Sequence, residues 1–388
     1  MSALMPTYAR YPVHLVRGDG LTVWDYAGRA YLDFAAGIAA VPIGHSHPDW
    51  FEAVTAQAAR LAHVSNLFHT GPQERLAERI LEVSGLPDGS VFLSNSGAEA
   101  NEAALKLARR HGGGRTKVVA LEGSFHGRTF ATLAATGQPS KGAPFRPLPE
   151  GFVHVPPNDT AALAGVIDDE TAAVLVEPVL GEGGVVPLEP AYLEAARSLC
   201  DEHGSILIFD EVQTGVGRSG AWWAFQRMGV TPDVFTSAKA LAAGLPIGAT
   251  VVARADLAFA AGEHASTFGG GPVPCAAALA VLDVIEREGL LANTEAMGAR
   301  LREGLAAAMR QTGAAGEPRG LGLLLAVPVP NAHEAALGLI DRGFLTTEAG
   351  PHALRVTPPL TVHAAAVDAF VEALGEVLAS IDREAVRT

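Results

Sequence analysis

The sequence predicts an α/β protein with a large domain, built on a mainly parallel sheet flanked by helices, and a smaller α+β domain formed from both chain ends. Three observations lead to this prediction. At 388 residues, the chain exceeds the length that one hydrophobic core usually supports. Its middle alternates short apolar runs with helix-length segments, and both ends are patterned differently from that middle.

The apolar runs of the middle are rich in β-branched residues, and they lie at 118–121, 172–179, 206–209 and 250–253. Residues 189–203 have the pattern of an amphipathic helix that ends at Gly204, a residue suited to a left-handed cap. Strands and helices that alternate in this way form parallel sheets with right-handed crossovers.

The two ends predict the smaller domain. Glycine turns are frequent in the first forty or so residues, and helical patterns without long buried strands resume from about Val281. We therefore expect residues 1–45 to join residues 266–388 in a small domain, beside a large domain at 46–265.

Composition excludes several functional classes. Hydrophobic residues make up 48% and charged residues 18%, as in a globular protein. A net charge of -14 without a basic run disfavours nucleic acid and anionic membranes as partners. Neither a signal sequence nor an apolar run of about 18 residues is visible. Cys200 and Cys275 lack the spacing of a zinc site or a disulfide framework, so we expect a cytoplasmic protein.

Lys239 is the strongest candidate for a catalytic amine among the four lysines of the chain. It follows a predicted buried strand in VFTSAKALAAGLPIG, where small apolar neighbours lower the pKa of an amine and favour its reactive neutral form. A solvated loop charge is the alternative interpretation. The other three lysines have ordinary settings: Lys106 in a surface helix, Lys117 at the start of a strand and Lys141 in a Gly/Pro loop.

A carboxylate at the end of another strand fits the same kind of site. In ILIFDEVQTG, Asp210 ends an apolar run at the carboxyl edge of the predicted sheet, where ligands bind in open parallel sheets. A buried carboxylate there needs a cationic partner, and the protonated pyridine nitrogen of pyridoxal 5′-phosphate (PLP) is one. An ion pair with an arginine explains Asp210 alone equally well.

The segment VFLSNSGAEANEAALKLARR predicts a strand that leads into a helix. Ser96 and Glu99 have the spacing of a capping box, while Gly97 and Ala98 leave the first amides of the helix open. Open amides at a helix N-terminus bind phosphate, although an ordinary capped helix remains the alternative.

Two other motifs are set aside. GVGRSG has the spacing of a dinucleotide-binding loop, but residues 211–214 separate it from the strand, and AWWAFQRMG is too short and bulky for the phosphate helix. We interpret it as a loop. His45 and His47 in GHSHP lack a supporting third ligand, so we expect a turn that leads into a helix and no metal site.

Together the motifs resemble those of the class III (ornithine-type) aminotransferases, a family of fold-type I PLP-dependent transferases. The resemblance covers nearly the whole chain, and the motifs are highly specific as a set. They are TYARYPV, YLDFAAGIAAVPIGHSHP, SNSGAEANEAALKLARR, GSFHGRT, EPVLGEGG, FDEVQTGVGRSG, SAKALAAGLPIGA, STFGGGP and LRVTPPL.

The resemblance implies a cofactor site and a substrate site. For PLP it implies Lys239 as the Schiff-base lysine, Asp210 at the pyridine nitrogen, Gln213 near the phenolic oxygen, Phe125 against the ring, and Gly97 and Ala98 at the phosphate. For substrates it implies Tyr8, Arg128, Arg355 and Glu182, with Arg128 on the distal carboxylate, Arg355 on the α-carboxylate of glutamate and Glu182 as the counter-ion of Arg355. It also implies a homodimer with shared active sites, in which Thr267 reaches the phosphate of the neighbouring subunit.

Two positions depart from the family pattern. Gly271 replaces the usual Asn of STFGGGP, which loosens a loop near the phosphate without removing Thr267. Ile38 stands where ornithine aminotransferases carry Tyr, and an apolar residue suits an N-acylated ornithine, whose α-nitrogen is uncharged.

The implied activity is transfer of the δ-amino group of N2-acetylornithine to 2-oxoglutarate in arginine biosynthesis. Other amine donors stay open: ornithine, succinylornithine, N-succinyldiaminopimelate, carrier-protein-linked lysine or ornithine, and 4-aminobutyrate. An aminomutase of the glutamate-semialdehyde type shares the fold. A PLP-binding regulator is disfavoured because the sequence has no basic patch or spare domain. A nicotinamide-dependent oxidoreductase would rest on GVGRSG alone.

Overall fold

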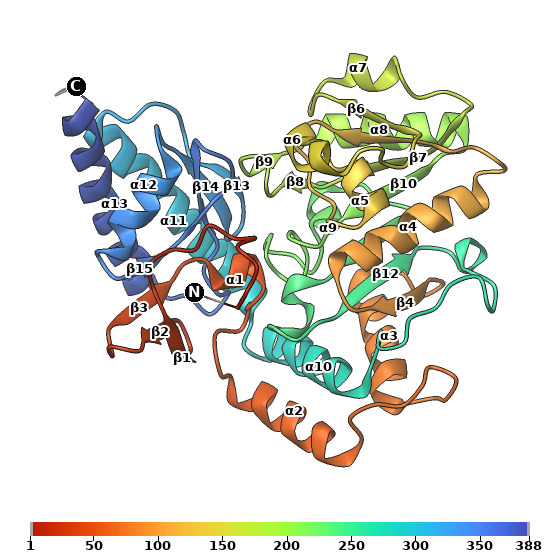
Figure 1. Ribbon diagram of the computed structural model, residues 1–388, viewed down its shortest axis with the longest axis horizontal. Helices are drawn as coiled ribbons and strands as arrows, with labels where there is room; N and C mark the ends of the chain where they lie inside the picture. The colour runs from red at the N-terminus through yellow and green to blue at the C-terminus, as the bar shows by residue number, and fades with distance from the viewer. Residues whose placement is uncertain (1–2, 386–388) are drawn as a thin grey trace.

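The computed structural model describes residues 3–385, and its larger part is built on a seven-stranded sheet (Figure 1). Four neighbouring pairs, from β6 to β11, are parallel. The mainly parallel sheet that the sequence predicts is therefore confirmed. In sheet order the strands are β4 (Ser90–Ser94), β12 (Gly248–Val252), β11 (Val234–Ser237), β10 (Ile206–Asp210), β7 (Thr171–Val176), β5 (Lys117–Leu121) and β6 (Phe152–Val155).

One strand runs against the prediction of a parallel sheet. The run at 250–253 corresponds to β12, which pairs antiparallel with both β11 and β4. The connection from β11 to β12, residues 238–247, is too short to hold a crossover helix, so the chain turns back instead of crossing over. That short return contains Lys239.

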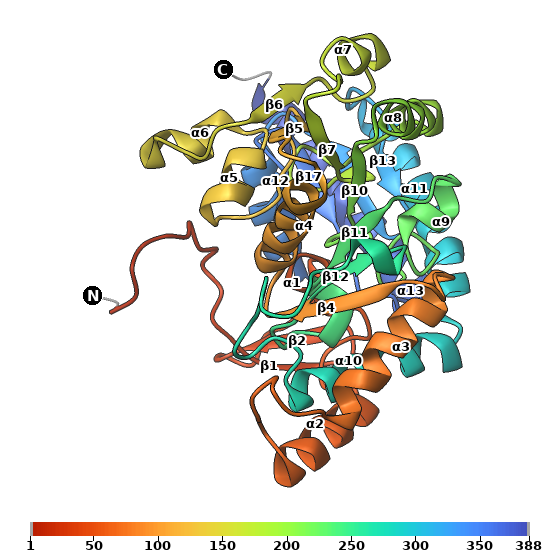
Figure 2. The same cartoon turned by 90° about the vertical axis from the view of Figure 1, so that its right-hand side faces the viewer.

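Helices cover both faces of this sheet, as Figure 2 shows with α4 on one side and α3 and α8 on the other. Every residue of β7, β10, β11 and β12 is buried, which explains why these strands are mostly apolar. The helices are α3 (Gly71–Ser84), α4 (Gly97–His111), α5 (Phe130–Ala135), α6 (Pro139–Gly142), α7 (Thr160–Ala164), α8 (Pro190–His203) and α9 (Ala224–Met228), with 3-10 turns η1 (Ala143–Phe145), η2 (Lys239–Ala242) and η3 (Ala255–Leu257).

The helix predicted at 189–203 is α8, and Gly204 ends it with φ of 61°, in the left-handed region. Beyond β7, a short hairpin of β8 (Val179–Leu180) and β9 (Val186–Pro187) extends toward the smaller part of the molecule (Figure 1).

The smaller part combines both chain ends. Its first sheet joins β1 (Leu15–Asp19), β2 (Thr22–Asp25) and β3 (Ala30–Asp33) to β15 (Phe344–Leu345), so residues over 300 positions apart pair side by side. Its second sheet contains β13 (Arg319–Leu321), β14 (Leu324–Pro328), β17 (Ala353–Val356) and β16 (Thr347–Glu348). The helices there are α11 (Leu290–Thr312), α12 (Ala332–Ile340) and α13 (Ala364–Ala385).

The second small sheet differs from the expectation of helices without long buried strands. All residues of β17 and nearly all of β14 are buried. Apolar runs this short cannot be distinguished from buried helix by periodicity, so the sequence does not reveal them.

No helix within residues 3–385 is long and apolar enough to cross a bilayer.

Helices α2 (Pro48–Arg60) and α10 (Pro272–Arg287) pack against each other, and α10 also packs against α3 and η2 (Figure 1). The division at residues 45/46 and 265/266 stays a prediction, since α10 lies beyond 265 and still contacts these elements of the larger part.

Segment α1 (Ala36–Ala39) is a left-handed turn, because Ala36, Gly37, Ile38 and Ala39 have φ between 44° and 63°. A β-branched residue such as Ile38 adopts this conformation at a cost of order 1 kcal/mol or more. Asp33 stabilises the turn by accepting hydrogen bonds from the amides of Ala35 and Ala36. The turn leads to Ala40, which lines the cavity described below.

Candidate active site

A cavity of about 420 Å³ lies where β10 and β11 end, against the N-terminus of α4. This is the edge of the sheet at which ligands bind in open α/β folds. Seven predicted site residues line it: Gly97, Ala98, Phe125, Arg128, Asp210, Gln213 and Lys239.

Lys239 is the second residue of the short return between β11 and β12, and it is half-buried. Burial lowers its pKa, and the nearby carboxylates, Glu182 foremost, oppose that shift only in part. Its φ of 27° lies in the left-handed region, which a lysine rarely adopts. The fold thus holds a strained backbone in order to present an amine that loses its proton easily.

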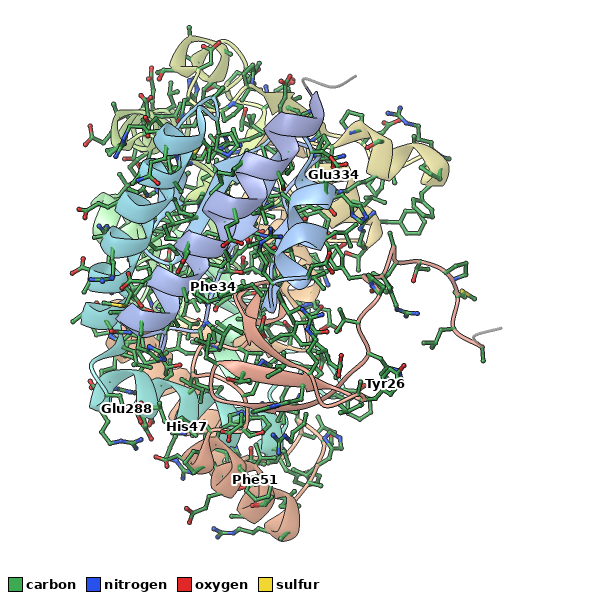
Figure 3. All side chains as sticks on the ribbon, turned by 90° about the vertical axis from the view of Figure 1, so that its left-hand side faces the viewer. Tyr26, Phe34, His47, Phe51, Glu288 and Glu334 are labelled. Atoms are coloured by element: carbon green, nitrogen blue, oxygen red, sulfur yellow. The ribbon has the colours of Figure 1, made fainter. Side chains whose placement is uncertain are left out.

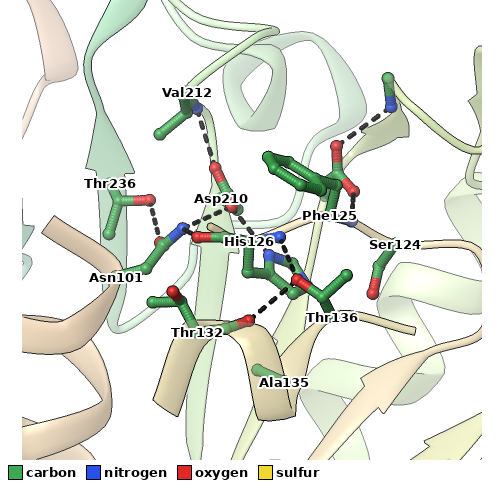
Figure 4. A network of polar contacts seen from close by, with 12 residues as sticks. Asn101, Ser124, Phe125, His126, Thr132, Ala135, Thr136, Asp210, Val212 and Thr236 are labelled. Atoms are coloured by element: carbon green, nitrogen blue, oxygen red, sulfur yellow. Dashed lines mark hydrogen bonds and ion pairs between the residues drawn. The ribbon is translucent and has the colours of Figure 1, made fainter. Parts of the chain in front are cut away.

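Asp210 is held by three neighbours at the end of β10 (Figure 4). Its Oδ2 accepts hydrogen bonds from Asn101 Nδ2 at 2.7 Å and His126 Nδ1 at 2.8 Å, and its Oδ1 accepts from Val212 N at 3.1 Å. Thr236 in turn donates to Asn101 Oδ1 at 2.7 Å. The carboxylate therefore has one fixed orientation.

His126 is fully buried, and its Nε2 has no hydrogen-bond partner within residues 3–385. Because the carboxylate of Asp210 accepts from Nδ1, a neutral ring carries its proton on Nδ1 and leaves no unpaired N–H in the core. The backbone N–H of His126 donates to Thr136 Oγ1 at 3.0 Å, which holds the main chain at this residue (Figure 4).

The start of α4 faces the cavity with Gly97 and Ala98. Ser96 Oγ accepts from Glu99 N at 3.2 Å, as the capping spacing predicts, but Glu99 Oε2 accepts from Asn95 N instead of Ser96 N. A side chain at Gly97 would place a Cβ 2.9 Å from the methyl groups of Val212, which follows Asp210. Glycine at this position therefore allows the N-terminus of α4 to approach the loop that follows Asp210.

Phe125 is fixed by a buried carboxylate. Its backbone N–H donates to Glu177 Oε1 at 2.8 Å, and Gly181 N donates to Glu177 Oε2 at 3.0 Å. Burial raises the pKa of Glu177 above its ordinary value. Sequence reasoning did not single out Glu177, although the motif EPVLGEGG contains it.

Arg355, on β17 of the smaller part of the molecule, lies close to the cavity but does not line it. Its Nη1 donates to Glu182 Oε1 at 2.5 Å, to Gly181 O at 3.0 Å and to Gln213 Oε1 at 3.2 Å. Gln213 lines the cavity, so Arg355 and Glu182 lie immediately behind it. Burial raises the pKa of Glu182, but the guanidinium of Arg355, with Lys239 and Lys141, holds it below the ordinary carboxyl value.

The N-terminal segment contributes Tyr11 to this region. The Tyr11 hydroxyl donates to Glu348 Oε1 at 2.9 Å, and the backbone oxygen of Glu348 accepts from Arg355 Nη2 at 3.2 Å. Tyr8, the predicted residue of the same motif, is 75% exposed on a segment that extends from the body of the molecule (Figure 2). The structure of one chain does not bring Tyr8 to the cavity.

Thr267 is also outside the cavity of its own chain. It is exposed and lines a separate groove with Asn66 and His264, next to the exposed side chain of Phe268. Gly271, the departure from the family pattern, directly precedes α10, and Ile38 is half-buried.

The histidines of GHSHP each have a carboxylate partner. His45 Nε2 lies 2.8 Å from Asp33 Oδ2, and His47 Nε2 lies 3.2 Å from Glu288 Oε1, as Figure 3 shows for the second pair. Within residues 3–385, His, Cys, Asp and Glu side chains form no group of three that could hold a metal ion. GVGRSG forms a series of turns, in agreement with its interpretation as a loop.

A lysine and a fixed, buried carboxylate in one cavity, at the strand ends of a mainly parallel sheet, are the arrangement of the fold-type I PLP-dependent transferases. The family model "Aminotransferase class-III" matches residues 4–378, and the chain belongs to that family.

Individual relatives agree with the family. The chain is 44% identical to the acetylornithine aminotransferase of Caldanaerobacter subterraneus, covering 97% of this chain and 98% of the relative. It is 48% identical to the acetylornithine aminotransferase of Streptomyces coelicolor, with 97% and 93% covered. Its structure is similar to that of ornithine aminotransferase from Toxoplasma gondii, which has partial PLP occupancy at its active site, with a TM-score of 0.93, 32% identity and 98% and 93% of the chains covered.

Proposed function

We propose that the protein transfers the δ-amino group of N2-acetylornithine to 2-oxoglutarate and so forms N-acetylglutamate 5-semialdehyde and L-glutamate. The observation that carries this proposal is the pairing of Lys239 and Asp210 in one cavity, which Arg128 also lines and behind which Arg355 contacts Gln213. The curated relatives of Caldanaerobacter and Streptomyces bear the name of this activity. The product glutamate semialdehyde derivative belongs to arginine biosynthesis.

The residues around the cavity fit PLP. Lys239 offers a buried amine with a lowered pKa, and Gly97 and Ala98 offer the start of a helix to a phosphate. Among the described residues, Asp210 Oδ1 accepts only from Val212 N, so it retains a lone pair for a ring N–H. PLP supplies an aldehyde that accepts the amino group and a protonated ring that withdraws electrons from the substrate.

Each residue then has a defined task. Lys239 Nζ would hold the cofactor and, when free, would act as the acid and base at the reacting carbon of the substrate. Asp210 would keep the ring nitrogen protonated, and Asn101 and His126 keep Asp210 in place. Phe125 would cover the ring face, and Gln213 would hold the phenolic oxygen.

The substrate carboxylates are bound by the two arginines. Arg128 binds the distal carboxylate of either substrate, and Arg355 binds the α-carboxylate of glutamate or 2-oxoglutarate. When the ornithine derivative is bound, no carboxylate reaches Arg355, and Glu182 neutralises its buried charge. The 2.5 Å ion pair supports this assignment.

Steady-state comparison of amine donors tests the proposal. With 2-oxoglutarate as the common acceptor, N2-acetylornithine should give a higher kcat/KM than ornithine, succinylornithine, N-succinyldiaminopimelate, carrier-protein-linked lysine or ornithine, and 4-aminobutyrate. A higher value for any of these would reassign the donor. Turnover without 2-oxoglutarate would instead indicate an aminomutase.

We infer further that the enzyme is a cytoplasmic homodimer with Thr267 at the partner's phosphate site. Leu67 is 88% exposed and lines the same groove as Thr267, and an apolar side chain so exposed suits an interface. Cys200 and Cys275 are both buried and unpaired, as suits a reducing compartment. Thr267→Ala should weaken PLP binding in a dimer, and a monomeric mass by light scattering would contradict the assembly.

A further inference from the structure

Lys141 lies closer to the active site than its Gly/Pro-rich sequence indicates. It belongs to α6, on the side of the larger part that faces the smaller part (Figure 1). Its Nζ is 5.9 Å from the centre of the Phe125 ring, and Phe125 lines the cavity. Lys141 is half-buried. Its charge is therefore held near the cavity and is not on a free surface loop.

The Lys141 side chain has no hydrogen bond or ion pair with any residue that the structure describes. The two other lysines outside the cavity do: Lys106 Nζ lies 2.8 Å from His264 Nδ1, and Lys117 Nζ donates to Val166 O at 2.8 Å and pairs with Asp168. The face of the Phe125 ring attracts this half-buried ammonium, but no acceptor among the described residues replaces the hydrogen bonds to water that it loses. This cost indicates a partner that binds from solution.

Arg128 also lies beside Phe125 and also lacks an ionic partner among the described residues, although its side chain is exposed. Its guanidinium carbon is 5.5 Å from the centre of the same Phe125 ring, and it has no carboxylate partner among residues 3–385. Two cations beside one ring repel each other, and an anion bound between them offsets this repulsion. Burial raises the pKa of Glu182, and the positive charge of Lys141 helps Arg355 and Lys239 to lower it.

We propose that Lys141 is a further substrate-binding residue, whose Nζ binds, together with Arg128, the substrate carboxylate farthest from the reacting carbon. Arg128 offers a planar pair of donors to one edge of that carboxylate, and the compact ammonium of Lys141 can take a remaining lone pair. For 2-oxoglutarate the group bound is the γ-carboxylate. For the amine donor, the assignment rests on the proposed function and concerns the carboxylate of N2-acetylornithine.

Binding of glutarate, a dicarboxylate that cannot react, tests Lys141 without turnover. Titration calorimetry on the holoenzyme should show glutarate bound about 10-fold more weakly by Lys141→Met, with much of the affinity restored in Lys141→Arg. Lys106→Met is the matched control, because its Nζ also lies 5.9 Å from an aromatic ring, that of Phe259. It should bind glutarate as the unsubstituted enzyme does. Affinity within twofold in Lys141→Met would overturn the proposal.

A pair of donors separates this assignment from the proposed function. Lys141→Met should lower kcat/KM about 10-fold for N2-acetylornithine and leave it unchanged for N-acetyl-1,4-diaminobutane, which lacks the carboxylate. Equal losses for both amines would overturn the role of Lys141 and leave the donor assignment intact. If glutarate binding depends on Lys141 but N2-acetylornithine is not a substrate, the substrate-binding role of Lys141 is supported and the donor assignment is wrong.

Discussion

Arg355 Nη1 donates to Glu182 Oε1 at 2.5 Å, and this pair joins β17 of the smaller part to the β8–β9 hairpin of the larger part. The arginine side chain is 1% exposed and the glutamate 25% exposed. A guanidinium buried to this degree is costly without an anion beside it. Glu182 retains enough freedom at the surface to move away when a substrate carboxylate competes for Arg355.

Removal of either partner should therefore affect the two half-reactions differently. In Glu182→Ala, Arg355 is always free, so the glutamate half-reaction should gain on the order of 10-fold in kcat/KM relative to the N2-acetylornithine half-reaction. Arg355→Ala should reduce the glutamate half by about 10²-fold and the ornithine half much less. Single-turnover rates measured separately for each half decide the matter. Equal effects on both half-reactions would contradict an exchange of Arg355 between Glu182 and the substrate carboxylate.

Loss of the Lys239 amine should stop turnover. Lys239→Ala removes the group that holds the cofactor and moves the proton, so kcat should fall at least about 10³-fold. The purified protein should be yellow from its lysine-bound cofactor, and the variant should lose that absorption band. Near-normal transamination by the variant would remove Lys239 from the mechanism. Lys106→Met, which keeps every cavity residue, serves as the control.

The sequence predicts the residues that follow strands more reliably than those that support them. Lys239 and Asp210 could be found because each ends a recognisable apolar run. Asn101 and His126 could not, because they meet Asp210 over 109 and 84 positions of the chain. Such pairings depend on how α4, which carries Asn101, and the loop after β5, which carries His126, pack against the sheet, and no local pattern encodes this packing.

The N-terminal segment shows the same limit. Tyr8 and Tyr11 stand in one motif without helical or strand periodicity, so their neighbours cannot be deduced from the sequence. The partner of Tyr11, Glu348, lies 337 positions away. The direction of β12 likewise depends on the length of the turn around Lys239, which hydrophobic patterning does not specify.

Replacement of Asp210 by asparagine should separate cofactor binding from chemistry. The amide keeps the shape of the carboxylate, and its oxygen can keep the hydrogen bonds from Asn101 Nδ2 and His126 Nδ1 while the one from Val212 N is lost, so PLP should still bind. An amide cannot keep the ring nitrogen protonated, and single-turnover rates should fall by on the order of 10²-fold or more. Unchanged rates at full cofactor occupancy would contradict the proposed role of Asp210.

Glu211, the residue after Asp210, should make stability depend on pH. It is 1% exposed, accepts from Phe225 N at 2.8 Å and is hydrogen-bonded to Thr214 Oγ1 at 2.5 Å. Burial raises its pKa from an ordinary 4.5 to about 7, since its hydrogen bonds compensate only in part. Between these two values the folded protein binds more protons at this site than the unfolded chain, so stability falls as pH rises through that interval.

Glu211→Gln should remove this contribution, because the amide is neutral at every pH, keeps an oxygen for Phe225 N and can donate to Thr214. The unsubstituted enzyme should lose stability at this site as pH rises, and the variant should not. The difference in free energy of unfolding between them should therefore grow, in favour of the variant, by roughly 1–3 kcal/mol from about pH 5 to about pH 8. Urea unfolding at several pH values measures the difference, and Glu202→Gln, at an exposed position on α8, should leave the curve unchanged. Glu177 is buried with a raised pKa in both proteins, so its effect cancels in the comparison. Parallel curves for Glu211→Gln and the unsubstituted enzyme would mean that Glu211 is neutral throughout, or charged throughout, in the folded protein.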